Sequence, residues 1–322
     1  MEHRPLGRSG LSIAPLMLGG NVFGWTADEK TSHAILDAFV AGGFNAIDTA
    51  DVYSAWVPGN TGGDSEKVIG TWLKARGRRD DVIIATKVGM WPVHPGLKAA
   101  NIVAACEDSL VRLQTDYIDL YQSHRDDADA PQDETLEAYG RLVKAGKVRA
   151  IGASNFETDR LASAEATSKA HGYPRYDTLQ PAYNLMDRAI EGPLQQLCLK
   201  ENVSIISYYG LASGYLTGKY RSMEDLGKSP RGGGMKKHLE GEKGPKVLAA
   251  LDSVAADVGA SPAQVALAWV MARPAVAAPI ASATSVEQLA ELMHALTLEL
   301  TPEEIRRLDA AGSQSSVPKT LS

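Results

Sequence analysis

The chain has 322 residues, of which 44% are hydrophobic and 22% are charged, a composition typical of a globular protein. Its formal net charge of −6 argues against a nucleic-acid partner. The first ten residues lack the apolar core of a signal peptide, and no apolar run reaches the roughly 18 residues of a membrane span. We therefore expect a cytoplasmic protein that does not associate with membranes.

The chain alternates short apolar runs with longer amphipathic ones. Several short runs, such as VIIATKVG and VSIISYYG, are apolar throughout, a pattern that favours parallel strands covered on both faces. The predicted strands cover residues 16–20, 45–50, 82–89, 117–123, 148–154, 178–183, 204–209 and 276–281. Helical periodicity predicts helices over residues 30–41, 65–76, 102–113, 135–145, 159–170, 192–201, 262–271 and 286–295.

Eight strands alternating with eight helices predict an α/β fold, and the count of eight favours a closed (β/α)8 TIM barrel formed by one domain, residues 1–322. An open dinucleotide-binding sheet would carry a GxGxxG after its first strand, and LMLGGNVFG has the wrong spacing. Two segments are additional to the repeat. Residues 3–15 predict an N-terminal hairpin below the barrel. Residues 222–244 predict a long polar loop after strand seven, either a mobile cover for a cofactor or a tolerated insertion.

The two cysteines, Cys106 and Cys198, fall in separate predicted helices. Neither belongs to a Cys-x-x-Cys pair or to a cluster of cysteines and histidines, which are the usual marks of a zinc site. We expect two reduced thiols and no bound metal.

Polar side chains follow three successive predicted strands. Asp48 and Tyr53 follow strand two, Lys87 ends strand three, and His124 follows strand four. Because the carboxyl ends of barrel strands meet at one rim, we expect these four side chains to lie together. Buried charges are costly unless paired, so Asp48 and Lys87 are natural partners. Taken singly, these residues also have structural interpretations. Asp48 and Lys87 fit an ion pair, Tyr53 fits an ordinary loop aromatic residue, and His124 fits a hydrogen-bonded residue at a strand end.

Together, the four residues suit carbonyl chemistry. An ammonium beside a phenol favours the phenolate, so we expect Lys87 to lower the pKa of Tyr53 and make it a usable acid and base near neutral pH. His124 is placed to orient a substrate oxygen. Since no side chain supplies hydride, the electrons must come from a cofactor.

At these residues the sequence resembles the aldo-keto reductase superfamily, most closely its bacterial branches, over nearly the whole chain. The segments RPLGRSGL, DTADVY, ATKVG, YQSH, IGASNF, LQPAYN and YLTGKY look like that family's signatures and occur in its order. The resemblance implies hydride transfer between NADP(H) and an aldehyde or ketone, or its alcohol. It also carries the family's catalytic tetrad over to Asp48, Tyr53, Lys87 and His124, with Tyr53 as the general acid and base.

The resemblance further implies a cofactor extended across the rim. The matching positions lie at the ends of strands one, two, five, six, seven and eight. They are Gly20, Asn21, Asp48, Ser154, Asn155, Gln180, Tyr208, Tyr209, Gly210, Leu211, Ser213, Gly214, Lys219, Ser282, Ala283, Thr284 and Gln288. Barrels often bind phosphate after strands seven and eight, which gives this placement a physical reason.

Three positions depart from the family pattern. Tyr209 stands where a small hydroxyl usually faces the pyrophosphate, Thr284 where many members carry a basic residue, and Leu292 where an asparagine often contacts adenine. These departures leave NADH open as a second cofactor, with Lys219 or Arg231 as compensating cations.

The substrate pocket is predicted from the loops that follow strands one to four. These loops carry Trp25, Trp56 and Trp91, with Tyr53 and His124, and predict an aromatic wall. Arg125 either meets an anionic or hydroxylated substrate or pairs with a neighbouring aspartate. The partner is a small molecule, and the chain acts as a monomer or a homo-oligomer. Two rival functions remain: a non-catalytic cofactor-binding regulatory subunit of the same fold, and a Schiff-base aldolase acting through Lys87.

Overall fold

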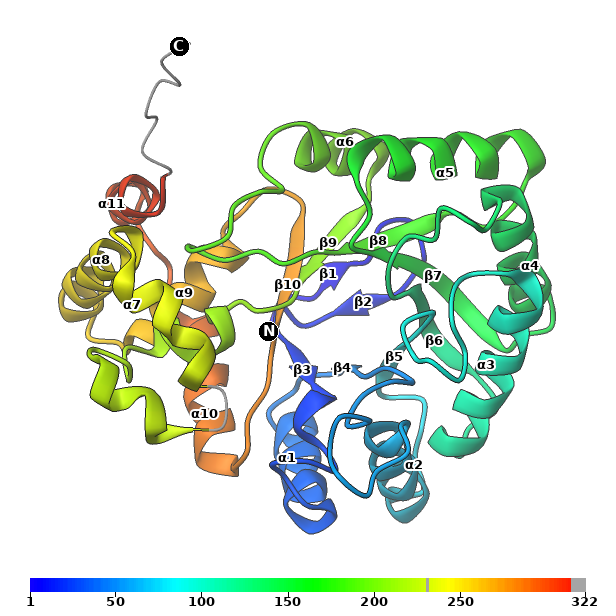
Figure 1. Ribbon diagram of the computed structural model, residues 1–322, viewed down its shortest axis with the longest axis horizontal. Helices are drawn as coiled ribbons and strands as arrows, with labels where there is room; N and C mark the ends of the chain where they lie inside the picture. Colours follow the sequence, from blue (N-terminus) through cyan, green and yellow to red (C-terminus); the bar gives the residue numbers. More distant parts are fainter. Residues whose placement is uncertain (230–231, 314–322) are drawn as a thin grey trace.

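A computed structural model describes residues 1–229 and 232–313 (Figure 1). Eight parallel strands close into a barrel in the order β10-β3-β4-β5-β6-β7-β8-β9. Their bounds are β3 Met17–Gly19, β4 Ala46–Asp48, β5 Ile83–Val88, β6 Ile118–Ser123, β7 Val148–Ser154, β8 Tyr176–Gln180, β9 Ser204–Ser207 and β10 Val276–Ala281. The predicted (β/α)8 barrel is confirmed, and seven of its strands fall within predicted apolar runs, whereas β8 begins two residues before the run predicted over residues 178–183.

Helices surround the barrel and bury the outer faces of its strands (Figure 1). They are α1 Glu29–Ala41, α2 Asp64–Arg76, α3 Ala99–Leu113, α4 Gln132–Lys144, α5 Thr158–His171, α6 Pro193–Glu201, α7 Lys236–Glu240, α8 Lys243–Val258, α9 Pro262–Met271, α10 Val286–His294 and α11 Pro302–Gly312. Short 3₁₀ segments are η1 Gly20–Val22, η2 Ala212–Thr217, η3 Met223–Lys228, η4 Gly232–Met235 and η5 Ala295–Thr297. All eight predicted helices are present.

Three helices, α7, α8 and α11, were not predicted. The start of α11 carries a clear signal, because Thr301 caps the helix, Glu304 completes a capping box and Pro302 occupies the first turn. In α8, Gly244 and Pro245 sit in the first turn and mask a helical pattern whose apolar side is buried. The predicted loop 222–244 therefore ends where α8 begins and contains η3, η4 and α7, while residues 230 and 231, including Arg231, lie outside the described residues.

The N-terminal hairpin closes the end of the barrel opposite the carboxyl ends of the strands. Strand β1 (Arg4–Pro5) pairs antiparallel with β2 (Ser12–Ile13), inside the ring of barrel strands in Figure 1. Leu6 and Ile13 are fully buried in the cluster that fills the barrel interior. The backbone N–H of Gly7 donates to Ser204 Oγ at 2.8 Å. The predicted hairpin below the barrel is thus confirmed.

Among the described residues, no single helix has both the length and the hydropathy of a membrane span. Helices α8 and α9 meet that criterion only as a pair, and the pair is bent by 94°.

Candidate active site

Adjacent strands bring Asp48, Lys87 and His124 to one rim. Strands β4, β5 and β6 are neighbours in the barrel, and Lys87 pairs in register with Gln122, two residues before His124. Asp48 ends β4, Lys87 lies one residue before the end of β5, and His124 directly follows β6. The carboxyl ends of the parallel strands therefore bring these three side chains together, as the sequence pattern predicted.

Lys87 is the centre of the site. Its side chain is fully buried, and Nζ donates to Asp48 Oδ2 at 2.7 Å, to the Thr49 carbonyl at 2.8 Å and to the Tyr53 hydroxyl at 2.9 Å. The Tyr53 hydroxyl donates in turn to Asp48 Oδ2 at 3.3 Å. Three acceptors match the three hydrogens of an ammonium, so the buried charge is both paired and fully hydrogen-bonded.

The expected lowering of the Tyr53 pKa is wrong for this structure. Burial of the phenol and the nearby Asp48 carboxylate raise the pKa of Tyr53 well above its ordinary value. Burial also lowers the pKa of Lys87, although Asp48 opposes that shift. Desolvation disfavours the phenolate more than the single ammonium favours it, so Tyr53 is a protonated phenol at neutral pH.

His124 faces Tyr53 across the site. Its ring centroid lies 6.0 Å from the Tyr53 ring, and 9% of the residue is exposed. Burial, with Lys87 and Arg125 as further causes, lowers the pKa of His124 well below its ordinary value, so the imidazole is neutral. Its Nδ1 is buried and has no hydrogen-bond partner within the described part of the chain.

An amide network supports the second oxygen of Asp48. Gln180 Nε2 donates to Asp48 Oδ1 at 2.9 Å and to Gln122 Oε1 at 3.2 Å. Gln122 was not predicted as a site residue, although it stands in the YQSH segment next to the tetrad. Its position inside the barrel, fully buried, is what identifies it.

The cofactor positions predicted at the ends of β7, β8 and β9 also converge. Ser154 Oγ donates to the Gln180 carbonyl at 2.8 Å, and Asn155 Nδ2 donates to the carbonyl of His124 at 3.1 Å. The Tyr208 hydroxyl donates to Asn155 Oδ1 at 2.8 Å. These bonds join the ends of β7, β8 and β9 to the tetrad.

The loop after β9 is strongly curved. Tyr209, Ala212, Ser213 and Gly214 all have positive φ angles, and such turns direct backbone N–H groups into anion-binding concavities. Lys219 is exposed and lies close to Gly214, where a Cβ would stand 3.6 Å from its Nζ. Of the other predicted residues in this loop, Gly210 is buried and Leu211 is half-buried.

The ends of β3 and β10 meet on the other side of the mouth. Ser282 Oγ donates to Asn21 Oδ1 at 2.6 Å, and Asn21 shares η1 with Gly20. Ala283 is fully buried. The backbone N–H and the hydroxyl of Thr284 both donate to Gln288 Oε1 at 3.0 Å, so these two predicted residues bond each other at the start of α10.

Two of the three predicted tryptophans stand together. Trp25 and Trp56 have ring centroids 5.7 Å apart, and Trp56 lies 6.2 Å from the Tyr53 ring. Trp91 instead contacts His94, with the Arg112 guanidinium over its ring. The structure therefore brings Trp25 and Trp56, but not Trp91, into ring contact at the tetrad.

Asp51 is a further residue that was not singled out. Its side chain is buried, and both carboxyl oxygens lack a hydrogen-bond partner among residues 1–229 and 232–313. Burial and the nearby Glu66 raise the pKa of Asp51 to about 8. The motif DTADVY contains this second aspartate, but only the fold shows that its oxygens are unbonded within the described residues.

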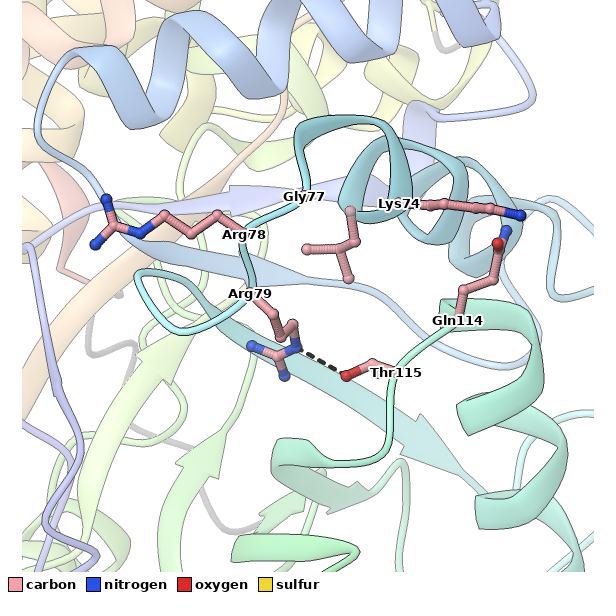
Figure 2. Close-up of a pocket in the computed structure, with 7 residues that line it drawn as sticks. Lys74, Gly77, Arg78, Arg79, Gln114 and Thr115 are labelled. Atoms are coloured by element: carbon pink, nitrogen blue, oxygen red, sulfur yellow. Dashed lines mark hydrogen bonds between the residues drawn. The ribbon is translucent and has the colours of Figure 1, made fainter.

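A separate cavity of about 340 Å³ lies away from these residues, at the ends of α2 and α3 (Figure 2). It is lined by Leu73, Lys74, Gly77, Arg78, Arg79, Gln114 and Thr115. Arg79 is already bonded to Thr115 and Asp119, and the two helix C-termini carry partial negative charge. This cavity has none of the acid–base groups of the rim.

Comparison with known proteins identifies the family of the chain. The family model described as "Aldo/keto reductase family" matches residues 15–313. The chain is 36% identical to an uncharacterized oxidoreductase, YrpG, of Bacillus subtilis over 96% of this chain and 95% of that protein. It is 34% identical to Protein tas of Escherichia coli over 99% of both chains. It is 32% identical to a probable voltage-gated potassium channel subunit beta of Oryza sativa subsp. japonica over 96% of both. With this match spanning nearly its whole length, the chain belongs to the aldo/keto reductase family.

Proposed function

We propose that the protein is an NADP(H)-dependent oxidoreductase that interconverts an aldehyde or ketone and its alcohol. The observation that carries the proposal is the Tyr53 hydroxyl, held at 2.9 Å by Lys87 Nζ at the rim of the barrel. A bound nicotinamide supplies or accepts the hydride. The protein is proposed to act in the cytoplasm as a single domain on a small molecule.

The four residues of the tetrad have different roles in the proton transfer. In the reducing direction, Tyr53 gives its proton to the carbonyl oxygen, and the raised pKa of the phenol keeps that proton in place until the oxygen becomes basic. Lys87 then donates a hydrogen bond to the phenolate, and Asp48 holds the ammonium in position. The neutral imidazole of His124 lies on the facing side and orients the same oxygen.

Several groups at the rim suit a dinucleotide. Among the described residues, no donor bonds Gln180 Oε1, which leaves it able to accept from a carboxamide, and Asn155 lies exposed beside it. The curved backbone of residues 209–214, with Lys219, suits a pyrophosphate. Thr284 and the start of α10 are the candidates for the adenosine phosphate. Because Thr284 carries no charge, NADH remains a possible second cofactor.

The test is Tyr53→Phe. The ring keeps its packing against Trp56, but the proton donor is lost, so we expect kcat for NADPH-dependent aldehyde reduction to fall by about 100-fold or more. Binding of NADPH, followed by nicotinamide fluorescence, should stay close to that of the wild type. Wild-type rates in the purified variant would refute the role of Tyr53.

The regulatory-subunit alternative draws support from the similarity to the potassium channel subunit beta. Steady-state NADPH oxidation with a panel of carbonyl compounds separates the two, because a binding module would bind NADPH without turnover. The aldolase alternative needs a Lys87 amine free of a carboxylate. Asp48 at 2.7 Å argues against it.

A further inference from the structure

Arg125 follows His124 at the mouth of the site, and in the part of the chain that the structure describes it has no acidic partner. It is exposed and follows His124 directly at the end of β6. Within residues 1–229 and 232–313, no carboxylate forms an ion pair with it. The alternative that Arg125 pairs with a neighbouring aspartate is therefore wrong for this structure.

The neighbouring carboxylates are bonded elsewhere. Asp126 accepts two bonds from Arg160, at 2.7 and 2.9 Å. Asp127 accepts from the backbone N–H of Leu97 at 2.7 Å and from that of Asp129 at 3.0 Å. These bonds hold the segment that carries Arg125, and they leave its guanidinium available.

The positive charge reaches the reacting groups. Arg125 is one of the causes that lower the pKa of His124, so its charge acts at the imidazole. Of the two buried carboxyl groups beside Tyr53, Asp48 pairs with Lys87, and the raised pKa keeps Asp51 protonated at neutral pH. On a chain with a net charge of −6, the Arg125 guanidinium gives this mouth a local attraction for anions.

The same mouth offers flat apolar surface. Trp56 is 50% exposed and forms edge contacts with both Trp25 and Tyr53. An exposed indole beside the proton donor favours a planar ring in the substrate. A guanidinium favours a carboxylate, which it binds through two parallel hydrogen bonds.

Resting on the proposed reductase function, we infer that the preferred substrates are aromatic aldehydes that carry a carboxylate. The ring packs on Trp56, the carbonyl oxygen lies between Tyr53 and His124, and Arg125 binds the carboxylate. Arg125 is thus a specificity-determining residue and takes no part in proton or hydride transfer.

The experiment compares 3- and 4-formylbenzoate with the corresponding formylbenzamides, which match their shape without the charge. NADPH-dependent kcat/KM is measured for wild type, Arg125→Gln and the control Arg78→Gln, which removes an exposed arginine beside the distant cavity of Figure 2. We expect the wild type to prefer at least one carboxylate over its amide by about tenfold. Arg125→Gln should abolish that preference through KM, and Arg78→Gln should leave it unchanged.

Binding is measured in parallel by quenching of tryptophan fluorescence, so that failure of the two proposals is distinguishable. If no aldehyde is reduced but Arg125→Gln selectively weakens formylbenzoate binding, the reductase proposal fails and the anion site stands. Equal handling of carboxylate and amide by the wild type, or equal effects of Arg125→Gln on both, would overturn the anion site.

Discussion

Asp48 and Asp51 are both buried and lie a few residues apart, but their carboxyl groups differ in hydrogen bonding. Asp48 forms an ion pair with Lys87 and accepts a hydrogen bond from Gln180, so both of its carboxyl oxygens are bonded. Among the described residues, neither oxygen of Asp51 has a hydrogen-bond partner, because the nearby Arg112 bonds Glu66 at 2.6 Å and Thr86 bonds the other oxygen of Glu66. A buried carboxyl without a donor is held in its neutral form.

This difference predicts a pH dependence of stability. The pKa of Asp51 is raised from 3.8 to about 8 in the folded protein. Between about pH 4 and pH 8 the folded chain keeps a proton that the unfolded chain has released, so the free energy of unfolding falls as pH rises, by up to about 1.4 kcal/mol per pH unit. Above pH 8 both states are ionised and the contribution levels off.

Asp51→Asn should remove that slope, which urea unfolding at pH 6, 7, 8 and 9 would measure. The control is Asp116→Asn, which changes an exposed carboxyl and should retain the wild-type slope. Parallel pH curves for wild type and Asp51→Asn would contradict the assignment of a neutral Asp51.

At the scale of elements, α2 and α3 pack closely against each other. Glu66 and Arg112 join the two helices by an ion pair, and the helix backbones meet closely at Gly70. A Cβ on Gly70 would stand 2.1 Å from the carbonyl oxygen of Arg112. The glycine is therefore required by the close approach of two helices rather than by its own φ angle.

Gly70→Ala is expected to destabilise the protein by about 1–3 kcal/mol, because overpacking outweighs the gain of about 1 kcal/mol in helix propensity. The matched control is Gly140→Ala in α4, where a Cβ would meet only the Pro174 side chain at 3.2 Å. Thermal and chemical unfolding of both variants would test this. A Gly70→Ala protein at least as stable as the wild type would show that α2 and α3 can separate without cost.

At the scale of the whole molecule, the candidate active site and the N-terminal hairpin lie at opposite ends of the barrel. The tetrad stands at the carboxyl ends of the strands, whereas the hairpin fills the other end with Leu6 and Ile13. Arg4 adds bonds to the carbonyls of Met271 and Val276, at 2.9 and 3.1 Å. The hairpin thus ties the N-terminus to the last barrel strand, far from the rim.

Leu6→Ala should cost about 2–5 kcal/mol of unfolding free energy, because it opens a cavity in the barrel interior. We expect the affinity for NADPH to be unchanged, since the substitution lies at the closed end. Leu199→Ala, which truncates a side chain that is 52% exposed, is the control and should be nearly neutral. A loss of NADPH affinity in a folded Leu6→Ala protein would argue that the two ends are coupled.

Much of this architecture could be predicted from the chain alone. Apolar runs and helical periodicity determine the eight strands and the helices that alternate with them, and barrel topology then brings Asp48, Lys87 and His124 to one rim. Thr301, Pro302 and Glu304 also mark the start of α11 by local signals alone. The sequence by itself therefore determined the fold and which strand-end residues meet at the rim, since both follow from short-range patterns and barrel topology.

Only the tertiary structure decided the electrostatics and the pocket. It separated Trp91 from Trp25 and Trp56, paired Asp126 with Arg160, and reversed the expected shift in the pKa of Tyr53. It also buried Asp51 where no described residue bonds its carboxyl oxygens. Each of these outcomes depends on burial or on contacts between residues distant in sequence. Desolvation and pairing are properties of the packed environment, which no local pattern specifies.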